Sequence, residues 1–349
     1  FWRCACGESE AIGSFAELRE RAREGLGDDF DPHRPYVDDV HLTCRSCDGT
    51  MTRVPEVLDV WYDSGAMPFA QQGYPHQTDD LAGVFPADYI CEALDQTRGW
   101  FYSLLAESTL LFDETSFRNV VCLGLILDGD GQKMSKSKGN VIEPWTVIER
   151  QGADAFRWYL FTAQSAGESF RFNLEAVDEA MRRFLLTLWN TYAFLVTYAS
   201  LEDGWTPDAT AAGTPNDLDR WILSRLDAAV DTVTAGLEDF DATAAGRAIE
   251  AFTDDLSNWY VRASRRRFWG TDRRAAADPA DRQAAFATLH ECLATLSALT
   301  APFCPFVAEE IYGNLVAVHD PSAPESVHLA DWPSAAGHRD EALESAMAL

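Results

Sequence analysis

Lysine is nearly absent from this sequence. Its 349 residues contain 25 arginines but only three lysines, Lys133, Lys136 and Lys138, all within one hexapeptide. The net charge is −28, whereas proteins that bind nucleic acids usually present a basic face to the phosphates. Because molar salt confines charge repulsion to within about 3 Å, we interpret the composition as adaptation to high salt, not as exclusion of nucleic acid. The three lysines are then expected to do something that arginine cannot do.

Other features are missing as well. No run approaches the roughly 20 consecutive apolar residues of a membrane-spanning helix, which argues against that class of protein. The sequence opens with Phe1-Trp2-Arg3-Cys4, without an initiator Met or the apolar core of a signal peptide, so we expect a piece of a longer protein. An apolar content of 47% and 11 tryptophans exclude a disordered tail and allow two or more packed domains.

The eight cysteines do not follow the pattern of a secreted disulfide scaffold. Two pairs, Cys4-x-Cys6 and Cys44-x-x-Cys47, have spacings typical of metal ligands and predict one tetrahedral zinc site of four thiolates. The alternative is a degenerate remnant that binds no metal, and His41 is a candidate substitute ligand. The other cysteines are expected to be small core residues of a protein from a reducing cytoplasm: Cys91, Cys122, Cys292 and Cys304.

Composition divides the chain into regions of different class. The first is polar, with cysteine pairs near both ends, and the second alternates strand-like and helix-like runs. The rest has helical periodicity, so the predicted fold class is α/β followed by an all-α bundle. The regions are 1–50, 51–165, 166–216 (a helix and a linker), 217–333 (the bundle) and 334–349 (an extension).

Residue patterns predict the main elements within these regions. Apolar and β-branched runs predict strands at 58–62, 89–93 and 119–127, and Asp and Gly predict a turn at 128–131. Apolar residues at helical spacing predict helices at 14–23, 95–109 and 176–198, and three more within 217–333, the last at about 281–299.

A loop with the sequence KMSKSKGN, Lys133 to Asn140, follows the last predicted strand and its Gly-rich turn. It combines small residues with ammonium groups, which follow moving phosphate oxygens more readily than rigid guanidinium forks do. Such a loop is suited to close over a polyanion and to stabilise charge on a leaving pyrophosphate. The alternative is a plain solvated basic loop, and the concentration of every lysine at this place argues against it.

The first five letters of this loop, KMSKS, are a signature of the class I aminoacyl-tRNA synthetases. Other runs extend the resemblance over essentially the whole chain, and they resemble the isoleucyl branch in its archaeal or eukaryotic form. These runs are VLDVWYDSGAMPFA (57–70), FPADYICEALDQTRGWFY (85–102), NWYVRASRRRFW (258–269) and HLADWP (328–333), the last similar to the family's ending of the anticodon domain.

The resemblance implies the second half of a Rossmann-like catalytic domain, with a zinc-ribbon-like insertion before it and a helical anticodon-binding domain after it. It implies activation of isoleucine with ATP and Mg²⁺, then transfer to tRNA(Ile), by a cytoplasmic monomer. The family's HIGH motif and most of its editing insertion are absent, so we expect the isolated chain to be inactive. A valyl-type or related synthetase and a non-catalytic tRNA-binding module stay open as alternatives.

The resemblance also implies roles for individual residues. Glu92 and Asp95 would bind the adenylate ribose, Gln96 the backbone end of isoleucine, and Trp61 and Trp100 would wall its side-chain pocket. A Glu at a strand end and an Asp at the start of the next helix independently place two acceptors where α/β proteins bind ligands. The alternatives are an Asp95 that caps its helix and tryptophans that only pack in the core. The remaining ATP or adenylate contacts would be Lys133, Lys136 and Ser137.

The densest basic cluster lies in the third region. At helical spacing, Arg262, Arg265 and Arg266 share one face, with Arg267 beside them and Trp269 among the flanking aromatics. Arginines interleaved with aromatics suit unstacked single-stranded RNA, so we expect an anticodon-binding face here. The alternative is a helix face paired with neighbouring carboxylates.

Overall fold

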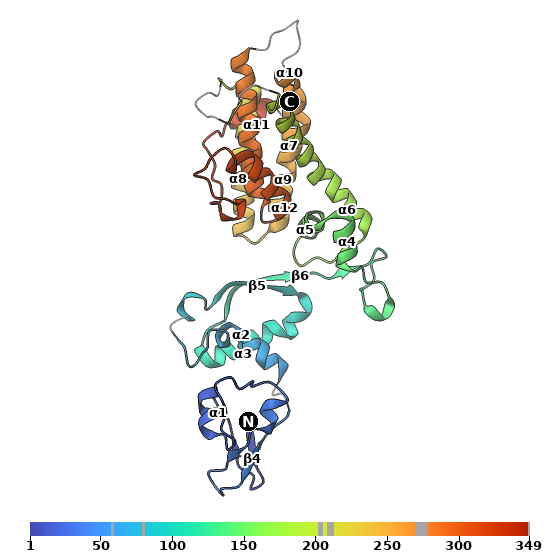
Figure 1. The fold of residues 1–349 in the computed structure, drawn as a ribbon. Coiled ribbons are helices and arrows are strands. Elements are labelled where there is room, and N and C mark those ends of the chain that lie inside the picture. The colour runs from blue at the N-terminus through green and yellow to red at the C-terminus, as the bar shows by residue number, and fades with distance from the viewer. Residues whose placement is uncertain (57–58, 79–80, 202–204, 208–212, 270–277, 348–349) are drawn as a thin grey trace. The chain divides into compact units, whose positions relative to one another are not determined.

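The structure is a computed structural model that describes residues 1–56, 59–78, 81–201, 205–207, 213–269 and 278–347. The chain divides into two compact units, each described by itself, and its path is traced in Figure 1. The first unit contains residues 1–87 and 97–116, and the second contains 88–96 and 117–349. No helix within the described ranges combines the length and the apolarity that crossing a membrane requires.

A small antiparallel sheet begins the first unit, in the strand order β2-β1-β4-β3. The predicted helix beside it is confirmed as α1 (Phe15–Arg21), because the Ser14 hydroxyl accepts the Glu17 N–H as an N-cap. Buried Trp2, Leu42 and Met51 form the core. The strands are β1 (Trp2–Cys4), β2 (Ser9–Glu10), β3 (Leu42–Thr43) and β4 (Thr50–Arg53).

Two helices complete the first unit, and both differ from the predicted elements. α2 (Val60–Ala70) lies where a strand was predicted at 58–62, because the Asp59 carboxylate accepts the N–H groups of Trp61 and Tyr62 and starts a helix. Residues 57 and 58 lie outside the described ranges. α3 (Trp100–Phe112) begins later than the predicted helix at 95–109, since residues 94–98 form a 3-10 turn, η3 (Leu94–Arg98).

The strand prediction at 89–93 is confirmed by β5 (Ala87–Ala93), which pairs with β6 (Phe117–Leu123). The single strand predicted at 119–127 is wrong, because β6 ends and β7 (Ile126–Leu127) pairs in parallel with β8 (Phe170–Arg171). Gly124 separates β6 from β7. A Cβ at this glycine would lie 2.1 Å from the Glu168 carbonyl oxygen, so the close backbone approach requires glycine.

The cysteine predictions for the core are half right. Cys292 and Cys304 are buried, as predicted. Cys91 is exposed on β5 and Cys122 is only half-buried on β6, so neither belongs to the core; within the described ranges these two strands form a sheet of their own.

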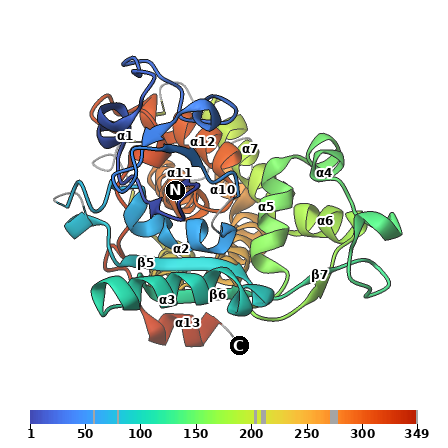
Figure 2. The ribbon, with the colours of Figure 1, turned by 90° about the horizontal axis from the view of Figure 1, so that it is seen from below.

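Helices make up the rest of the second unit. α4 (Pro144–Gln151), α5 (Ala153–Thr162) and α6 (Leu174–Ala180) share a core with β8. Figure 2 shows the three helices beside one another. A π-helical turn, η5 (Met181–Leu185), joins α6 to α7 (Leu186–Ala199), so the helix predicted at 176–198 is confirmed.

The predicted bundle after the linker is also confirmed. Its core extends to α5 and η5, where Trp158 stacks on Phe184 with ring centroids 3.7 Å apart. The linker predicted between the helices, 203–216, lies partly outside the described ranges. The bundle elements are α8 (Asp217–Glu238), α9 (Ala242–Asp254), η6 (Asp255–Val261), α10 (Arg262–Trp269), α11 (Pro279–Thr300), α12 (Pro305–Tyr312) and η7 (Gly313–Ala317), followed by α13 (Glu341–Met347).

Candidate active site, metal centre and RNA-binding face

The lysine loop, residues 133–140, links β7 to α4 in the second unit. Lys133 bridges to Leu127, and the 3-10 turn η4 (Lys136–Lys138) ends at Gly139, whose φ is +66°. Met134 packs onto the core shared by α4, α5 and α6. All three lysines are exposed, and within the described ranges none of them forms an ion pair. The loop therefore presents exposed ammonium groups, which is what an anion-binding element requires.

Two candidate ribose ligands lie near the end of β5. Glu92 is the last residue but one of the strand and Asp95 is in η3, and both residues are exposed. Gly99, not Asp95, is the N-cap of α3, which excludes a capping role for Asp95 in that helix. Gln96 is half-buried in the same turn. Both carboxylates thus stand at the end of a strand, where ligand contacts are common in α/β proteins.

The two candidate pocket tryptophans lie on the packed helices α2 and α3 of the first unit. The indole N–H of Trp100 donates to the Ser64 carbonyl at 3.0 Å, within one turn of Trp61. Trp61 is 47% exposed and is not a core residue of the described structure. The bond fixes the orientation of Trp100 relative to the helix that carries Trp61.

One carboxylate between these two helices, that of Glu107, was not among the site residues predicted from the sequence. Glu107 on α3 faces Gly65 on α2, where a Cβ would lie 2.2 Å from Glu107 Oε1. Its Oε2 is buried without a hydrogen-bond partner among the described residues. Burial raises the pKa of Glu107, and the negative charges of Asp63 and Asp59 raise it further. The sequence carries no signal for this environment, because it depends on contact between two helices.

The four predicted metal ligands converge in the first unit. The sulfur atoms of Cys4 and Cys47 are 3.5 Å apart and those of Cys6 and Cys44 are 3.7 Å apart. All four lie within 4.8 Å of one another, which fits a tetrahedron whose corners are about 2.3 Å from a zinc ion. Gly49 leaves room for the cluster, since a Cβ there would meet two of the sulfur atoms at 3.1 and 3.2 Å.

The local backbone explains how the short Cys4-x-Cys6 spacing is accommodated. Gly7 takes a φ of +96° and its N–H donates to the Cys4 carbonyl at 3.0 Å, which turns the chain from β1 back into its antiparallel partner β2. The predicted substitute ligand, His41, is not part of the cluster. Its Nδ1 lies 2.8 Å from Glu24 Oε1, so its ring has another partner.

A cationic and aromatic face lies on α10. Arg262, Arg265 and Arg266 are exposed, and no carboxylate of the described ranges pairs with them. Trp269, at the end of the helix, is 45% exposed. Exposed guanidinium groups can bind phosphates, and an exposed indole can stack on an unstacked base. This combination occurs in a chain whose net charge is −28.

Arg267 differs from the other three arginines. Its Nη1 and Nη2 each donate to an Asp219 oxygen at 2.7 Å, and its Nε donates to Asp281 at 3.0 Å. Burial by itself lowers the pKa of Arg267, but the hydrogen bonds and charge of Asp219 outweigh burial and raise it. The guanidinium group of Arg267 therefore binds carboxylates inside the bundle and does not belong to the exposed face of α10.

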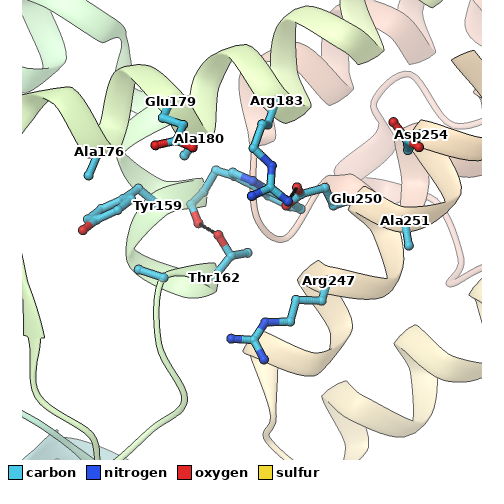
Figure 3. Close-up of a pocket in the computed structure, with 12 residues that line it drawn as sticks. Tyr159, Thr162, Ala176, Glu179, Ala180, Arg183, Arg247, Glu250, Ala251 and Asp254 are labelled. Atoms are coloured by element: carbon cyan, nitrogen blue, oxygen red, sulfur yellow. Dashed lines mark hydrogen bonds and ion pairs between the residues drawn. The ribbon is translucent and has the colours of Figure 1, made fainter. Parts of the chain in front are cut away.

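A pocket of about 690 Å³ lies elsewhere in the second unit, among α5, α6, η5 and α9 (Figure 3). Arg183 and Glu250 form an ion pair of 2.5 Å within it, and Arg247 lies on its other side (Figure 3). None of the predicted site residues lines this pocket. Its mixed charges identify no ligand class.

Comparison with known proteins assigns both parts of the chain. Residues 1–173 match the family of tRNA synthetases class I (I, L, M and V), and residues 219–349 match the anticodon-binding domain of tRNA ligases. Among solved structures, a LeuRS from Agrobacterium radiobacter K84 has a TM-score of 0.66 at 23% identity, covering 87% of this chain and 36% of that one. A methionyl-tRNA synthetase from Mycobacterium tuberculosis has a TM-score of 0.65 at 23% identity, covering 74% of this chain and 51% of that one. At this identity they show the fold alone.

Curated relatives share far more sequence. An isoleucine–tRNA ligase from Dehalococcoides mccartyi is 53% identical over 341 residues, which are 96% of this chain and 33% of that protein. One from Thermus thermophilus is 51% identical over 353 residues, or 99% of this chain and 33% of that protein. The chain thus spans about a third of the length of these relatives. It belongs to the class I tRNA synthetases, in the family of the isoleucine–tRNA ligases.

Proposed function

We propose that the full-length protein containing this chain activates isoleucine with ATP and transfers it to tRNA(Ile). One observation carries the proposal: the only lysines of the chain stand exposed on one loop between β7 and α4, and no carboxylate of the described residues forms an ion pair with them. In this proposal Lys133 and Lys136 bind the ATP phosphates, together with Mg²⁺, and stabilise the negative charge that develops on the leaving pyrophosphate. Ser137 lies in the same loop and contributes to the ATP site.

The remaining contacts of the adenylate follow from the end of β5 and from α3. Glu92 and Asp95 accept hydrogen bonds from the ribose hydroxyl groups, and Gln96 binds the backbone end of isoleucine. Trp61 and Trp100 form walls of the side-chain pocket, and the bond from Trp100 to Ser64 supports that role by holding one wall in place. An apolar pocket of this kind separates isoleucine from smaller side chains only modestly, by about 1–3 kcal/mol per methylene.

The other proposed sites serve RNA binding and local folding. Arg262, Arg265, Arg266 and Trp269 would contact the anticodon loop, whereas Arg267 is committed to Asp219. Four converging thiolates support a structural zinc ion at Cys4, Cys6, Cys44 and Cys47. We also propose a cytoplasmic monomer of a salt-adapted, archaeal or eukaryotic type.

The substrate is tested by amino-acid-dependent exchange of pyrophosphate into ATP with the full-length protein. Isoleucine, valine, leucine and methionine are compared at equal concentration. The proposal predicts the highest kcat/KM for isoleucine, with valine lower by about 10- to 200-fold, the range expected for one methylene. Preference for valine or methionine would contradict the proposed substrate. No exchange with any of the four would favour a non-catalytic tRNA-binding protein.

A further inference from the structure

Asp128, directly after β7, is the hydrogen-bond centre of the turn that precedes the lysine loop. Its Oδ1 accepts the N–H of Gln132 at 2.7 Å and that of Asp130 at 3.1 Å. Its backbone N–H donates to the Gln132 carbonyl at 2.9 Å. Hydrogen bonds to the charged carboxylate, first from the Asn140 side chain and then from the Gln132 N–H, lower its pKa. Asp128 is therefore held as an acceptor at one end of the loop.

Asn140 occupies the other end of the loop and uses both halves of its amide. Its Nδ2 donates to Asp128 Oδ2 at 2.7 Å. Its Oδ1 accepts the backbone N–H of Ser135 at 2.9 Å, and a longer contact of 3.4 Å runs from Nδ2 to the Lys133 carbonyl. One side chain thus joins the two ends of the loop and also reaches its middle, beside Lys133 and Lys136.

We propose that Asp128 and Asn140 are positioning residues that clasp the base of the lysine loop. They hold Lys133 and Lys136 in a short, closed segment from which both ammonium groups project. The inference rests on the proposed function of these lysines. Without the clasp, the loop would have to be ordered at each binding event, which lowers the population of the competent arrangement.

The acceptor and the donor of the Asp128–Asn140 contact can be exchanged by mutation. An acid at 128 and an amide at 140 match as acceptor and donor, but Asn140→Asp sets two acceptors against each other and Asp128→Asn removes the charged acceptor. In the double variant Asp128→Asn with Asn140→Asp, the amide at 128 donates to the acid at 140. Its carbonyl oxygen still accepts from residues 130 and 132, and the acid at 140 still accepts from Ser135. Only the long contact to the Lys133 carbonyl is lost.

The first test uses pyrophosphate exchange with isoleucine in the full-length protein. Each single variant is expected to lower kcat by at least tenfold with the KM for isoleucine unchanged, and the double variant is expected to return within about threefold of the original. Asn314→Asp is the matched control, because Asn314 Nδ2 also donates to a carboxylate, Glu310 Oε1, at 2.9 Å but within the bundle. It should leave exchange unchanged. If the single variants lose activity and the double variant does not recover it, the clasp is wrong. It is also wrong if the single variants keep full activity and their loop is cleaved by protease at the original rate.

The second test measures how accessible the loop is to a protease, and it does not depend on catalysis. A lysine-specific protease can cut this chain only after Lys133, Lys136 and Lys138, so cleavage in the full-length protein, mapped by mass spectrometry, reports on the loop. Both single variants should be cut at least fivefold faster at these positions, and the double variant at the original rate. Unchanged cleavage in the single variants would overturn the clasp. Faster cleavage with unchanged exchange would uphold the clasp and contradict the proposed role of the lysines.

Discussion

Arg267 and Asp219 form a two-pronged ion pair in the helical bundle, with both nitrogen–oxygen distances at 2.7 Å. The Asp219 side chain has no exposed surface, and the Tyr260 hydroxyl also donates to it at 2.7 Å. A buried carboxylate depends on such donors, because a charge without partners in the interior is costly. The pair therefore ties α8 to α10, the helix that carries the proposed RNA-binding arginines.

This pair predicts unequal effects for adjacent arginines. Arg267→Ala should lower the free energy of unfolding by about 3–5 kcal/mol, because it leaves Asp219 buried without its ion-pair partner. Arg267→Lys should recover only part of the loss, since one ammonium group cannot reproduce the two-pronged contact. Arg266→Ala, at an exposed position, should stay within about 0.5 kcal/mol. Urea denaturation of the full-length protein measures all three, and equal stability of the two alanine variants would contradict the structural role of Arg267.

A second prediction concerns pH and Glu107. Its folded-state pKa is raised, chiefly by burial, so its favourable contribution to stability is present below the unfolded-state pKa and is lost as pH rises through the folded-state pKa. Glu107→Gln should therefore raise the Tm at neutral pH, and the gain should shrink as the pH falls toward 4. Glu114→Gln, at an exposed position of the same unit, is the control. A gain that is independent of pH would contradict the buried-charge explanation.

A third prediction concerns the cysteine cluster. The full-length protein should lose about one zinc ion per chain when Cys47 is replaced by serine, because three thiolates hold the ion much less tightly than four. Cys91→Ser, at an exposed cysteine outside the cluster, should leave the zinc content unchanged. Elemental analysis of chelator-free preparations makes the comparison. Absence of zinc from the unaltered protein would favour the metal-free remnant, and one zinc ion per chain in both variants would contradict the role of Cys47 as a ligand.

RNA binding at high salt gives a fourth prediction. Phosphate contacts weaken with salt, whereas base stacking depends on it less. Trp269→Ala should therefore raise the Kd for tRNA(Ile) in molar KCl by roughly 5- to 150-fold, the equivalent of about 1–3 kcal/mol of stacking. Arg266→Ala should have a smaller effect at that salt. Phe306→Ala, at another exposed aromatic of the bundle, controls for loss of surface area. If Trp269→Ala binds like the control, the proposed face on α10 is wrong.

Site residues could be predicted from the sequence where the pattern that indicates them spans only a few neighbouring positions. The cysteine spacing indicated the cluster, and the concentration of lysines indicated the loop, because both depend on residue type over a few positions. The clasp was within reach of the same reasoning, since Asp128 and Asn140 bracket the motif, but the pattern indicated only a turn. The run at 58–62 was misread because one cap, Asp59, outweighs an apolar run that resembles a strand.

Long-range partners could not be predicted in this way. Arg267 looks like its neighbours in the sequence, and only the packing of α8 against the end of η6 and α10 supplies Asp219 and Tyr260. The buried environment of Glu107 likewise depends on Gly65 from another helix. The break at Gly124 depends on the backbone of Glu168. Each of these features arises from contacts between elements that are distant in the sequence. Patterns of local spacing contain no information about such contacts.

Pyrophosphate exchange by Lys136 variants of the full-length protein shows whether the lysines of the loop neutralise the phosphates of ATP. Lys136→Ala should lower isoleucine-dependent exchange at least tenfold, which corresponds to about 1.4 kcal/mol of transition-state stabilisation. Lys136→Arg should restore only part of the activity, because the guanidinium fork follows the phosphates less readily. Arg150→Ala, which removes an exposed cation from α4, should exchange normally. Unchanged exchange by Lys136→Ala would show that the loop lysines do not stabilise the leaving pyrophosphate.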